Sequence, residues 1–261
     1  MTNTVTIPSN MLPEDGRFGS GPTKIRPEQI QALDKGARDL LGTSHRQTPI
    51  KQVVGSIREG LSEFFQIPDG YEVVLGNGGA SAFWDIACAS LITRKAAFGT
   101  YGSFSSKFAK SAQSAPFLEE PEIFAGEPGT YRLPELTEYV DTYCWAHNET
   151  STGVAAPIKR IAGTKEQGAL TLIDATSGAG ALPVDISQTD AYYFSPQKAS
   201  VPTEACGSPC SPPPRSNAHT ASPKAWIFRA HAAGFPRSYR SPRPSRIRAR
   251  IRRSILQPWL R

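Results

Sequence analysis

The stretch Asp190-Ala-Tyr-Tyr-Phe-Ser-Pro-Gln-Lys198-Ala199 joins a short apolar run to a glutamine and a lysine. A second apolar run lies upstream, from Ala169 to Asp174, and it ends in an acid. Both runs have the length and composition of buried strands. Because parallel strands of a layered sheet end at one edge, where ligand sites gather, we expect Asp174 and Lys198 to lie near each other.

An acid at one strand end and a lysine after the next strand form a pair suited to pyridoxal phosphate. The carboxylate keeps the pyridine nitrogen protonated, and the lysine amine forms a Schiff base with the aldehyde. Each residue alone has an ordinary explanation. Asp174 is followed by Ala-Thr-Ser-Gly-Ala-Gly180, so it could cap a helix or a turn. An isolated lysine such as Lys198 is usually a solvated surface side chain.

Helical and strand-like patterns alternate through residues 21–200, after an extended arm over residues 1–20. This alternation predicts an α/β fold with a mostly parallel sheet and flanking helices. The expected helices run from Pro27 to Leu41, Ile50 to Phe65, Ala82 to Leu91 and Phe104 to Gln113. The expected strands run from Tyr71 to Leu75, Ala96 to Thr100, Thr142 to His147, Ala169 to Asp174 and Ala191 to Phe194.

Three further features fall at expected strand ends. Gly76-Asn-Gly-Gly-Ala-Ser81 follows a strand and opens a helix, so its backbone N–H groups could hold a phosphate. Such glycine-rich turns are often only turns, and this one matches no nucleotide fingerprint. The polar loop His147-Asn-Glu-Thr-Ser-Thr-Gly153 is equally ambiguous. Phe104 could stack on a flat ring, although an aromatic residue at helical spacing usually belongs to a core.

Residues 201–261 differ sharply from the rest of the chain. They hold Lys224 and eleven arginines against the single acid Glu204, and ten of the 23 prolines. Their net charge is therefore about +11 by count, whereas that of the whole chain is +6. A stretch with so little apolar periodicity cannot bury enough surface to offset the entropy of the chain. The basic balance consequently describes this tail and not residues 1–200.

The amino terminus, Met1-Thr-Asn-Thr, lacks the basic and apolar regions of a signal peptide, and we expect a cytoplasmic location. Cys88 and Cys144 lie in apolar surroundings that indicate reduced core thiols. A metal site is not expected, because the remaining candidates have spacing that matches no zinc motif and lie in the tail: Cys206, Cys210, His219 and His231.

The order of these pieces resembles the layout of fold type I aminotransferases. More closely, residues 12–199 resemble the phosphoserine aminotransferases of actinobacteria. The motifs that carry this resemblance are Asp15-Gly-Arg-Phe-Gly-Ser-Gly-Pro22, Gly42-Thr-Ser-His-Arg46, Leu75-Gly-Asn-Gly-Gly-Ala-Ser-Ala-Phe-Trp-Asp85, Trp145-Ala-His-Asn-Glu-Thr-Ser-Thr-Gly153, Ile173-Asp-Ala-Thr-Ser-Gly-Ala-Gly180 and Asp190-Ala-Tyr-Tyr-Phe-Ser-Pro-Gln-Lys198.

The resemblance implies roles for the ring-binding residues. Lys198 would carry the Schiff base and move the α-proton of the substrate. Asp174 would pair with the pyridinium nitrogen, Thr150 would bond to the ring hydroxyl, and Phe104 would stack on the ring. The cofactor phosphate would be held by four residues: Gly79, Ala80, Ser81 and Gln197.

The resemblance also implies a reaction. The family transfers the amino group of L-glutamate to 3-phosphohydroxypyruvate and yields O-phospho-L-serine, within serine and vitamin B6 synthesis. Arg46, beside His45, would bind a substrate carboxylate, because a guanidinium group matches a planar carboxylate. Members act as homodimers. Residues 21–200 would then form an incomplete cofactor-binding large domain, and no nucleic acid or membrane partner is expected.

The resemblance ends after Lys198. Relatives continue with Phe-(Ala/Gly)-Ser-Asp-Gly-Gly-Leu-Trp, whereas this chain continues from Ser200 with Val-Pro-Thr-Glu-Ala-Cys-Gly. Reading the last base of each codon with the first two bases of the next permits Ser-Asp-Gly-Gly-Leu-Trp in order from residues 201–207. We therefore infer the loss of one base after the codon of Ala199, by mutation or by sequencing error.

A tail read out of frame would have no selected fold, with at most a helix near Ala225–Ala233. The product would have exposed strand edges, marginal stability and negligible transaminase activity. Two alternatives stay open at this point. The chain could be a non-catalytic fragment that binds pyridoxal phosphate, or an interaction protein whose basic arm contacts phosphates.

Overall fold

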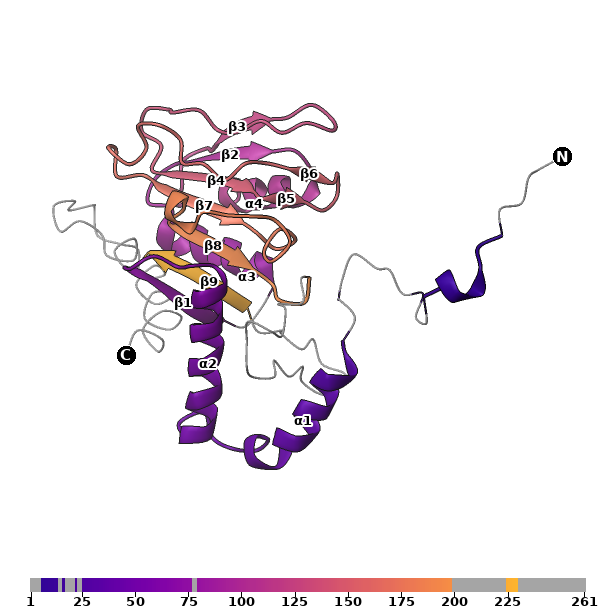
Figure 1. Cartoon of the computed structure of the whole chain (residues 1–261). Helices are drawn as coiled ribbons and strands as arrows, with labels where there is room; N and C mark the ends of the chain where they lie inside the picture. The colour runs from indigo at the N-terminus through magenta and orange to yellow at the C-terminus, as the bar shows by residue number, and fades with distance from the viewer. Residues whose placement is uncertain are drawn as a thin grey trace.

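The computed structural model in Figure 1 describes residues 6–13, 16, 22, 25–76, 79–198 and 224–229. Most of the basic tail therefore lies outside the described residues, and with it the four cysteines and histidines considered for a metal site. Among the residues that are described, no three His, Cys, Asp or Glu side chains gather in a way that could hold a metal ion.

A seven-stranded sheet forms the centre of the molecule, with the strand order β1-β9-β8-β7-β4-β2-β3. The strands from β3 to β8 pair in parallel, whereas β9 is antiparallel to both β8 and β1. It follows that β1 runs in the same direction as the parallel strands. The strands are β1 (Tyr71–Gly76), β2 (Ala96–Thr100), β3 (Glu122–Ala125), β4 (Thr142–Ala146), β7 (Leu170–Asp174), β8 (Ala191–Phe194) and β9 (Lys224–Arg229).

Four helices accompany the sheet within the described residues: α1 (Pro27–Leu40), α2 (Thr48–Phe64), α3 (Ala80–Ile86) and α4 (Ser103–Gln113). The predicted helices and the predicted mostly parallel α/β sheet are thus confirmed, with ends that differ by a few residues. One difference is larger, because the helix predicted to run to Leu91 changes to a π-helical turn over η2 (Ala87–Leu91). The amino-terminal arm also contains a short 3₁₀ turn, η1 (Ser9–Met11).

Side chains of the central strands are buried on both faces of the sheet. Tyr143 belongs to a cluster with Leu61 of α2, whereas the next residue, Cys144, belongs to a cluster with Phe83 of α3 and Phe108 of α4. Successive side chains of a strand point to opposite faces, so α3 and α4 cover one face (Figure 1). Burial on both faces explains why these strands read as continuous apolar runs.

The two thiols of the body are free and buried, as predicted. Burial raises the pKa of Cys88 to about 12. Cys144 is completely enclosed, and its pKa is raised well above the ordinary value, mainly by burial. Thiols held in the protonated form are poor nucleophiles, so these two residues act as core side chains.

Strand β9 (Lys224–Arg229) corrects the prediction for the tail. A helix was expected near Ala225–Ala233 if any structure formed, and that expectation is wrong for residues 224–229. The segment pairs along its whole length with β1 and over four residues with β8. Its Ala-Trp-Ile-Phe run suits a strand, and it supplies backbone partners that β1 and β8 would otherwise lack.

Three short strands also escaped the sequence patterns. β3 (Glu122–Ala125) is an edge strand in which Glu122 and Phe124 are half-buried and Ile123 and Ala125 are exposed. β5 (Asn148–Glu149) and β6 (Val154–Ala155) form a two-stranded sheet that closes the polar loop after β4. These segments are too short for a periodicity to be recognised.

Helices α1 and α2 stand apart from the sheet in Figure 1, and only the carboxyl-terminal end of α2 reaches it. Among the described side chains of α1, none is fully buried, and Ile30 is 59% exposed.

The described residues also contain no helix with the length and apolar character that crossing a membrane requires.

Candidate active site

The sheet topology gathers the predicted site residues at one edge. Strands β1, β2, β4, β7 and β8 run in the same direction, so their carboxyl ends lie together. The residues that follow these strands in turn are Gly79 to Ser81, Phe104, Thr150, Asp174, and the pair Gln197 and Lys198. This edge is where open α/β sheets bind their ligands.

Asp174 is the last residue of β7 and is almost completely buried. Its Oδ1 accepts a hydrogen bond of 2.9 Å from the backbone N–H of Thr176. Burial raises the pKa of Asp174, although hydrogen bonds from Thr176, Tyr193 and Trp84 oppose the shift. A cationic partner stabilises a buried carboxylate of this kind. Among the described residues, Asp174 forms no salt bridge.

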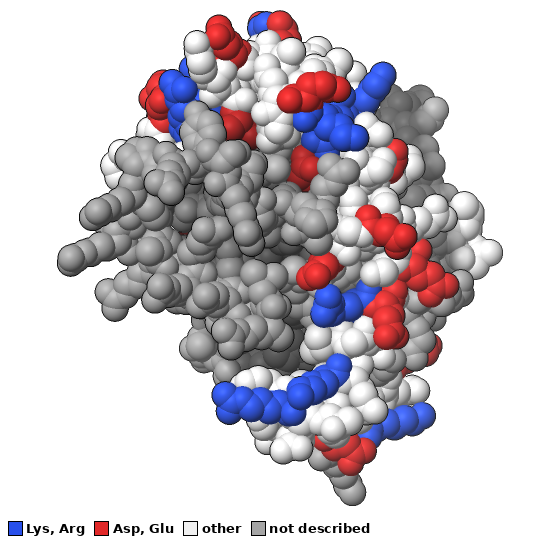
Figure 2. Space-filling view, turned by 90° about the vertical axis from the view of Figure 1, so that its left-hand side faces the viewer, with Lys and Arg blue, Asp and Glu red and all other residues white. Residues whose placement is uncertain are grey.

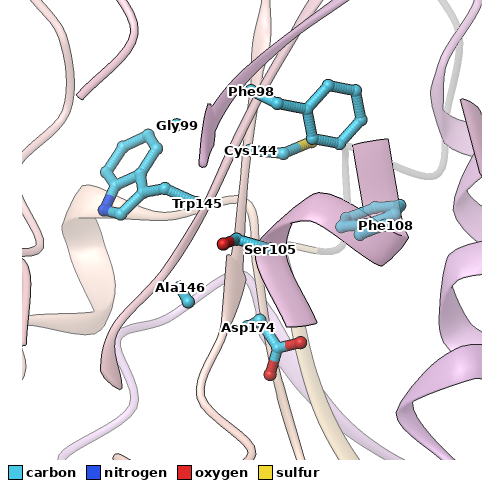
Figure 3. Close-up of a pocket in the computed structure, with 8 residues that line it drawn as sticks. All are labelled: Phe98, Gly99, Ser105, Phe108, Cys144, Trp145, Ala146 and Asp174. Atoms are coloured by element: carbon cyan, nitrogen blue, oxygen red, sulfur yellow. The ribbon is translucent and has the colours of Figure 1, made fainter. Parts of the chain in front are cut away.

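A narrow pocket reaches Asp174 from the side of α4 (Figure 3). Its lining is mostly apolar, and Figure 3 shows Asp174 at the end opposite Phe98. Ser105 at the start of α4 adds a hydroxyl group to the wall. The lining includes neither Thr150 nor Lys198, so Asp174 is the predicted site residue that this pocket contains.

Lys198 lies in the turn that follows β8, and β8 is the strand next to β7, which ends at Asp174. Its backbone N–H donates to the carbonyl oxygen of Ser195 over 3.2 Å, which closes the turn. The lysine is half-buried and Gln197 is exposed. In the β7–β8 ladder Asp174 is paired with Tyr193, so both predicted residues lie at the same edge on adjacent strands. If Asp174 and Lys198 lay at opposite edges of the sheet, they could not bind one cofactor together.

Thr150 is held by a hydrogen-bonded link to the loop after β7. Its hydroxyl donates to Oγ of Ser177 over 2.8 Å. The Ser177 hydroxyl lies 3.0 Å from both the carbonyl oxygen and Oδ1 of Asn148. The backbone N–H of His147 donates to the Asp174 carbonyl oxygen over 2.8 Å. These bonds fix the Thr150 loop against the strand that carries Asp174.

Phe104 is the second residue of α4, directly after the carboxyl end of β2. It is 41% exposed, so the structure excludes a core role and leaves its ring accessible at the sheet edge. The Nζ of Lys107 lies 5.4 Å from the centre of the ring. An exposed aromatic face beside the strand ends could cover a flat ligand.

Gly79 is the N-cap of α3, and Ala80 and Ser81 form its first turn. The first backbone N–H groups of a helix have no partner inside the helix, so those of this turn could donate hydrogen bonds to an anion, as predicted for the phosphate. The two preceding residues of the glycine-rich stretch lie outside the described residues. The predicted phosphate cradle is therefore described only at its helical end.

The structure does not bring His45 and Arg46 to this edge. Both are exposed in the turn between α1 and α2, where the Arg46 N–H donates to Oγ of Ser44 over 3.3 Å. Figure 1 places that turn at the end of α2 away from the sheet. Their predicted role as substrate-binding residues thus has no support from their position.

His147 and Glu149 had no assigned role in the sequence analysis. His147 is buried, with Nδ1 3.1 Å from the hydroxyl of Tyr192, and burial lowers its pKa to about 4. A side chain at Gly178 would meet its ring at 3.0 Å. Glu149 is completely buried beside α4. The only sequence signal was the presence of both residues in a polar loop directly after a buried strand.

Comparison with known proteins shows that this chain is similar to aminotransferases. The sequence model of the family described as "Aminotransferase class-V" matches residues 120–203. The structure is similar to a phosphoserine aminotransferase from Cytophaga hutchinsonii, with a TM-score of 0.66 and 22% identity, over 82% of this chain and 55% of that one. A phosphoserine aminotransferase from Trichomonas vaginalis, described as bound to PLP, gives a TM-score of 0.63 at 17% identity, over 90% and 63% of the two chains. The fold is thus that of the class-V aminotransferases.

The curated relatives of this chain carry a more specific name than class-V aminotransferase. A protein from Mycobacterium leprae named putative phosphoserine aminotransferase is 57% identical over 198 residues, which are 76% of this chain and 52% of that protein. A phosphoserine aminotransferase from Corynebacterium glutamicum is 56% identical over 76% of this chain and 52% of that protein. One from Nocardioides is 55% identical over 76% of this chain and 53% of that protein. The chain spans about half the length of the curated relatives it matches. The matched part of the chain is thus similar in sequence to phosphoserine aminotransferases.

Proposed function

We propose that this chain carries the cofactor-binding half of a phosphoserine aminotransferase. The observation that supports the proposal is the strand order: Asp174 ends β7, and Lys198 lies in the turn after the adjacent parallel strand β8, so both residues fall at one edge of the sheet. The family reaction moves the amino group of L-glutamate to 3-phosphohydroxypyruvate and gives O-phospho-L-serine. The proposed location is the cytoplasm, where serine and vitamin B6 synthesis takes place.

The donor set fits pyridoxal phosphate. The buried Asp174 has a raised pKa and suits a cationic ring nitrogen, which would hold the carboxylate in its ionised form. The Thr150 hydroxyl is oriented by Ser177 and can bond to a ring oxygen. Phe104 exposes its ring at the same edge. When bound, the cofactor supplies an electron sink for the carbanion formed at the substrate α-carbon.

The protein groups around that ring have separate tasks. Asp174 would keep the ring nitrogen protonated, and the Lys198 amine would hold the cofactor aldehyde and accept the substrate α-proton. Phe104 excludes water from one side of the ring. Backbone N–H groups of Gly79 to Ser81, together with Gln197, hold the phosphate. The exposed His45 and Arg46 are not assigned a substrate in this proposal, because they lie apart from the edge.

Covalent trapping tests this function. The purified chain is incubated with pyridoxal phosphate, reduced with borohydride and digested, and the modified lysine is identified by mass spectrometry. We expect one dominant adduct, on Lys198, and its loss in Lys198→Ala. The matched control is Lys165→Ala, which removes an exposed lysine in the turn before β7. Equal labelling of Lys165 and Lys198 would show non-specific reaction and refute the proposal.

The activity of a polypeptide of these 261 residues is a separate matter. We propose that it binds the cofactor but has no measurable transaminase activity, because it spans about half the length of its relatives. A loss of one base after the codon of Ala199 explains the departure of the tail from the family pattern. Glutamate-dependent turnover by the purified chain would contradict this, and sequencing of the DNA around codon 200 tests the frame directly.

One observation favours a different use of the tail. β9 comes from the basic segment and pairs inside the sheet, so part of the tail belongs to the fold. This supports the second candidate, a non-catalytic fragment that binds pyridoxal phosphate. In the face that Figure 2 shows, acidic and basic side chains are interspersed over the described residues. A confirmed reading frame together with soluble, folded protein would favour the fragment.

A further inference from the structure

Glu149 is a buried carboxylate that touches two segments far apart in the sequence. It is completely buried, at the end of the short strand β5, directly before Thr150. Among the described residues no salt bridge to Glu149 is formed, so hydrogen bonds alone compensate its charge. Buried carboxylates are costly unless every acceptor position is used.

The first segment is the start of α4. Glu149 Oε2 accepts from the backbone N–H of Ser105 over 2.8 Å, from its hydroxyl over 2.8 Å, and from the N–H of Phe104 over 3.1 Å. Gly102, the N-cap residue, has no side chain that could perform this task. Glu149 therefore acts as the cap of α4 from a distance of more than forty residues in sequence, and its negative charge suits the helix N-terminus.

The second segment is the loop that contains Thr150. Glu149 Oε1 accepts from the hydroxyl of Ser151 over 2.7 Å. Ser151 Oγ in turn accepts from the N–H of Ser103 over 2.8 Å, which adds a direct bond between the two segments. A Cβ atom at Gly102 would overlap the Glu149 side chain, so the glycine leaves the room that the carboxylate occupies.

The charge of Glu149 is retained in these surroundings. Burial by itself would raise its pKa, but the hydrogen bonds from Ser105 and Ser151 outweigh burial and hold the pKa below its ordinary value. An ionised carboxylate that accepts several N–H and O–H groups makes stronger bonds than a neutral side chain of the same shape. At neutral pH the carboxylate is therefore ionised, and charge-assisted hydrogen bonds link the two segments.

We propose that Glu149 is a positioning residue that fixes Phe104 and Thr150 relative to each other. Phe104 donates its backbone N–H to Glu149, and Thr150 is the next residue in the chain, so one carboxylate sets the separation of both. This inference rests on the proposed function, in which Phe104 and Thr150 contact the cofactor ring. Glu149 itself contacts protein groups only, as far as the described residues show.

The test is Glu149→Gln in the full chain, with pyridoxal phosphate as the probe. Glutamine keeps the shape but places an NH₂ group against N–H donors. We expect cofactor affinity to fall roughly 10- to 100-fold. We also expect the induced circular dichroism of the bound ring to change at saturation, because ring orientation changes. The control is Glu127→Gln, the same change at an exposed residue, which should bind as the wild type does.

Ser151→Ala provides a milder variant, in case Glu149→Gln does not fold. It removes the hydroxyl that donates to Glu149 and accepts from the Ser103 N–H, and it keeps the bonds that Glu149 accepts from Phe104 and Ser105. We expect affinity to fall a few-fold and the dichroism to change in the same direction. Wild-type affinity and wild-type dichroism in Ser151→Ala would overturn the inference.

The outcomes separate this inference from the proposed function. Saturable, Lys198-dependent binding by the wild type with unchanged affinity and dichroism in Glu149→Gln would overturn only the positioning role. Weaker binding with unchanged dichroism at saturation and a lowered melting temperature would overturn it as well, since that result indicates general destabilisation. Absence of Lys198-dependent binding in the wild type would remove the proposed function, and this inference with it.

Discussion

The parallel block and the amino-terminal flank of the molecule are built very differently. The parallel block, formed by β2, β4, β7 and β8 with α3 and α4, has side chains such as Tyr143, Ile173 and Tyr192 with no exposed surface. The amino-terminal flank, formed by α1, α2 and β1, has in α1 a helix without a fully buried described side chain. Leu61 at the end of α2 and Val73 of β1 still join the core, so the contrast is greatest for α1, and we expect the parallel block to be the more stable region.

The chemistry of the site divides along the same line. Asp174, Thr150, Phe104 and Lys198 all follow strands of the parallel block, and their loops are tied together by hydrogen bonds. The predicted phosphate turn, Gly79 to Ser81, instead follows β1 of the flank. β1 is joined to the block through β9 alone in the strand order. The proposed ring-binding residues thus all lie at strand ends of the block, whereas the proposed phosphate turn lies where β1 of the flank leads into α3 of the block.

The largest effect should follow from a cavity in the parallel block. Ile173→Ala removes a completely buried side chain of β7, and such changes cost about 2–5 kcal/mol. We expect urea unfolding to show this loss. A cost below about 1 kcal/mol would mean that the block is not the stable part of the molecule.

Breaking β9 should separate the two regions. Ile227→Pro removes a backbone donor from a strand paired on both sides, at a cost of about 3 kcal/mol. Hydrogen exchange should then show loss of protection in β1 and retained protection in β4 and β7. Ser216→Pro, elsewhere in the tail, is the control. Equal protection of β1 in both variants would show that β9 does not join the flank to the block.

His147 should make the parallel block sensitive to acid. Burial lowers its pKa from the ordinary 6.5 to about 4, so the unfolded chain binds the proton more tightly than the folded one. The stability from the neutral ring is complete above pH 6.5 and is lost as the pH falls toward 4, by roughly 3 kcal/mol. In His147→Gln the free energy of unfolding should fall less over this range. An unchanged pH dependence would contradict this assignment.

The smallest effect should come from the flank. Ile30→Ala truncates a side chain of α1 that is 59% exposed, and we expect a change within about 0.5 kcal/mol. The comparison with Ile173→Ala uses the same chemical change in the two regions. A loss comparable to that of Ile173→Ala would show that α1 is packed in solution against a surface that its exposure does not reveal.

Much of the parallel block could be predicted from sequence. The bounds of β2 and β8 match the predicted Ala96 to Thr100 and Ala191 to Phe194, because strands buried on both faces give unbroken apolar runs. The shared edge of Asp174 and Lys198 followed from strand direction. β9 could not be predicted, since its partners β1 and β8 lie far away in the sequence and no local pattern records a pairing.

The candidate site was predictable only in part. The sequence predicted that Phe104, Thr150, Asp174 and Lys198 lie at or after the ends of β2, β4, β7 and β8, and the structure has them there, whereas the roles assigned to them stay predictions. The contact of Glu149 with Ser105 joins residues 44 positions apart, so spacing within a loop could not reveal it. For Arg46 the sequence motif suggested a substrate-binding role, but the described fold leaves this residue away from the sheet edge that carries the other predicted site residues.

The place of β9 has a consequence for synthesis on the ribosome. β1 emerges roughly 150 residues before its neighbour in the sheet, which corresponds to about 8–30 seconds of translation at ordinary rates. During that interval the parallel block can form, while the hydrogen-bonding groups of β1 facing it stay unpaired. A nascent chain of this kind offers a long window to chaperones and to pairing with a neighbouring nascent chain.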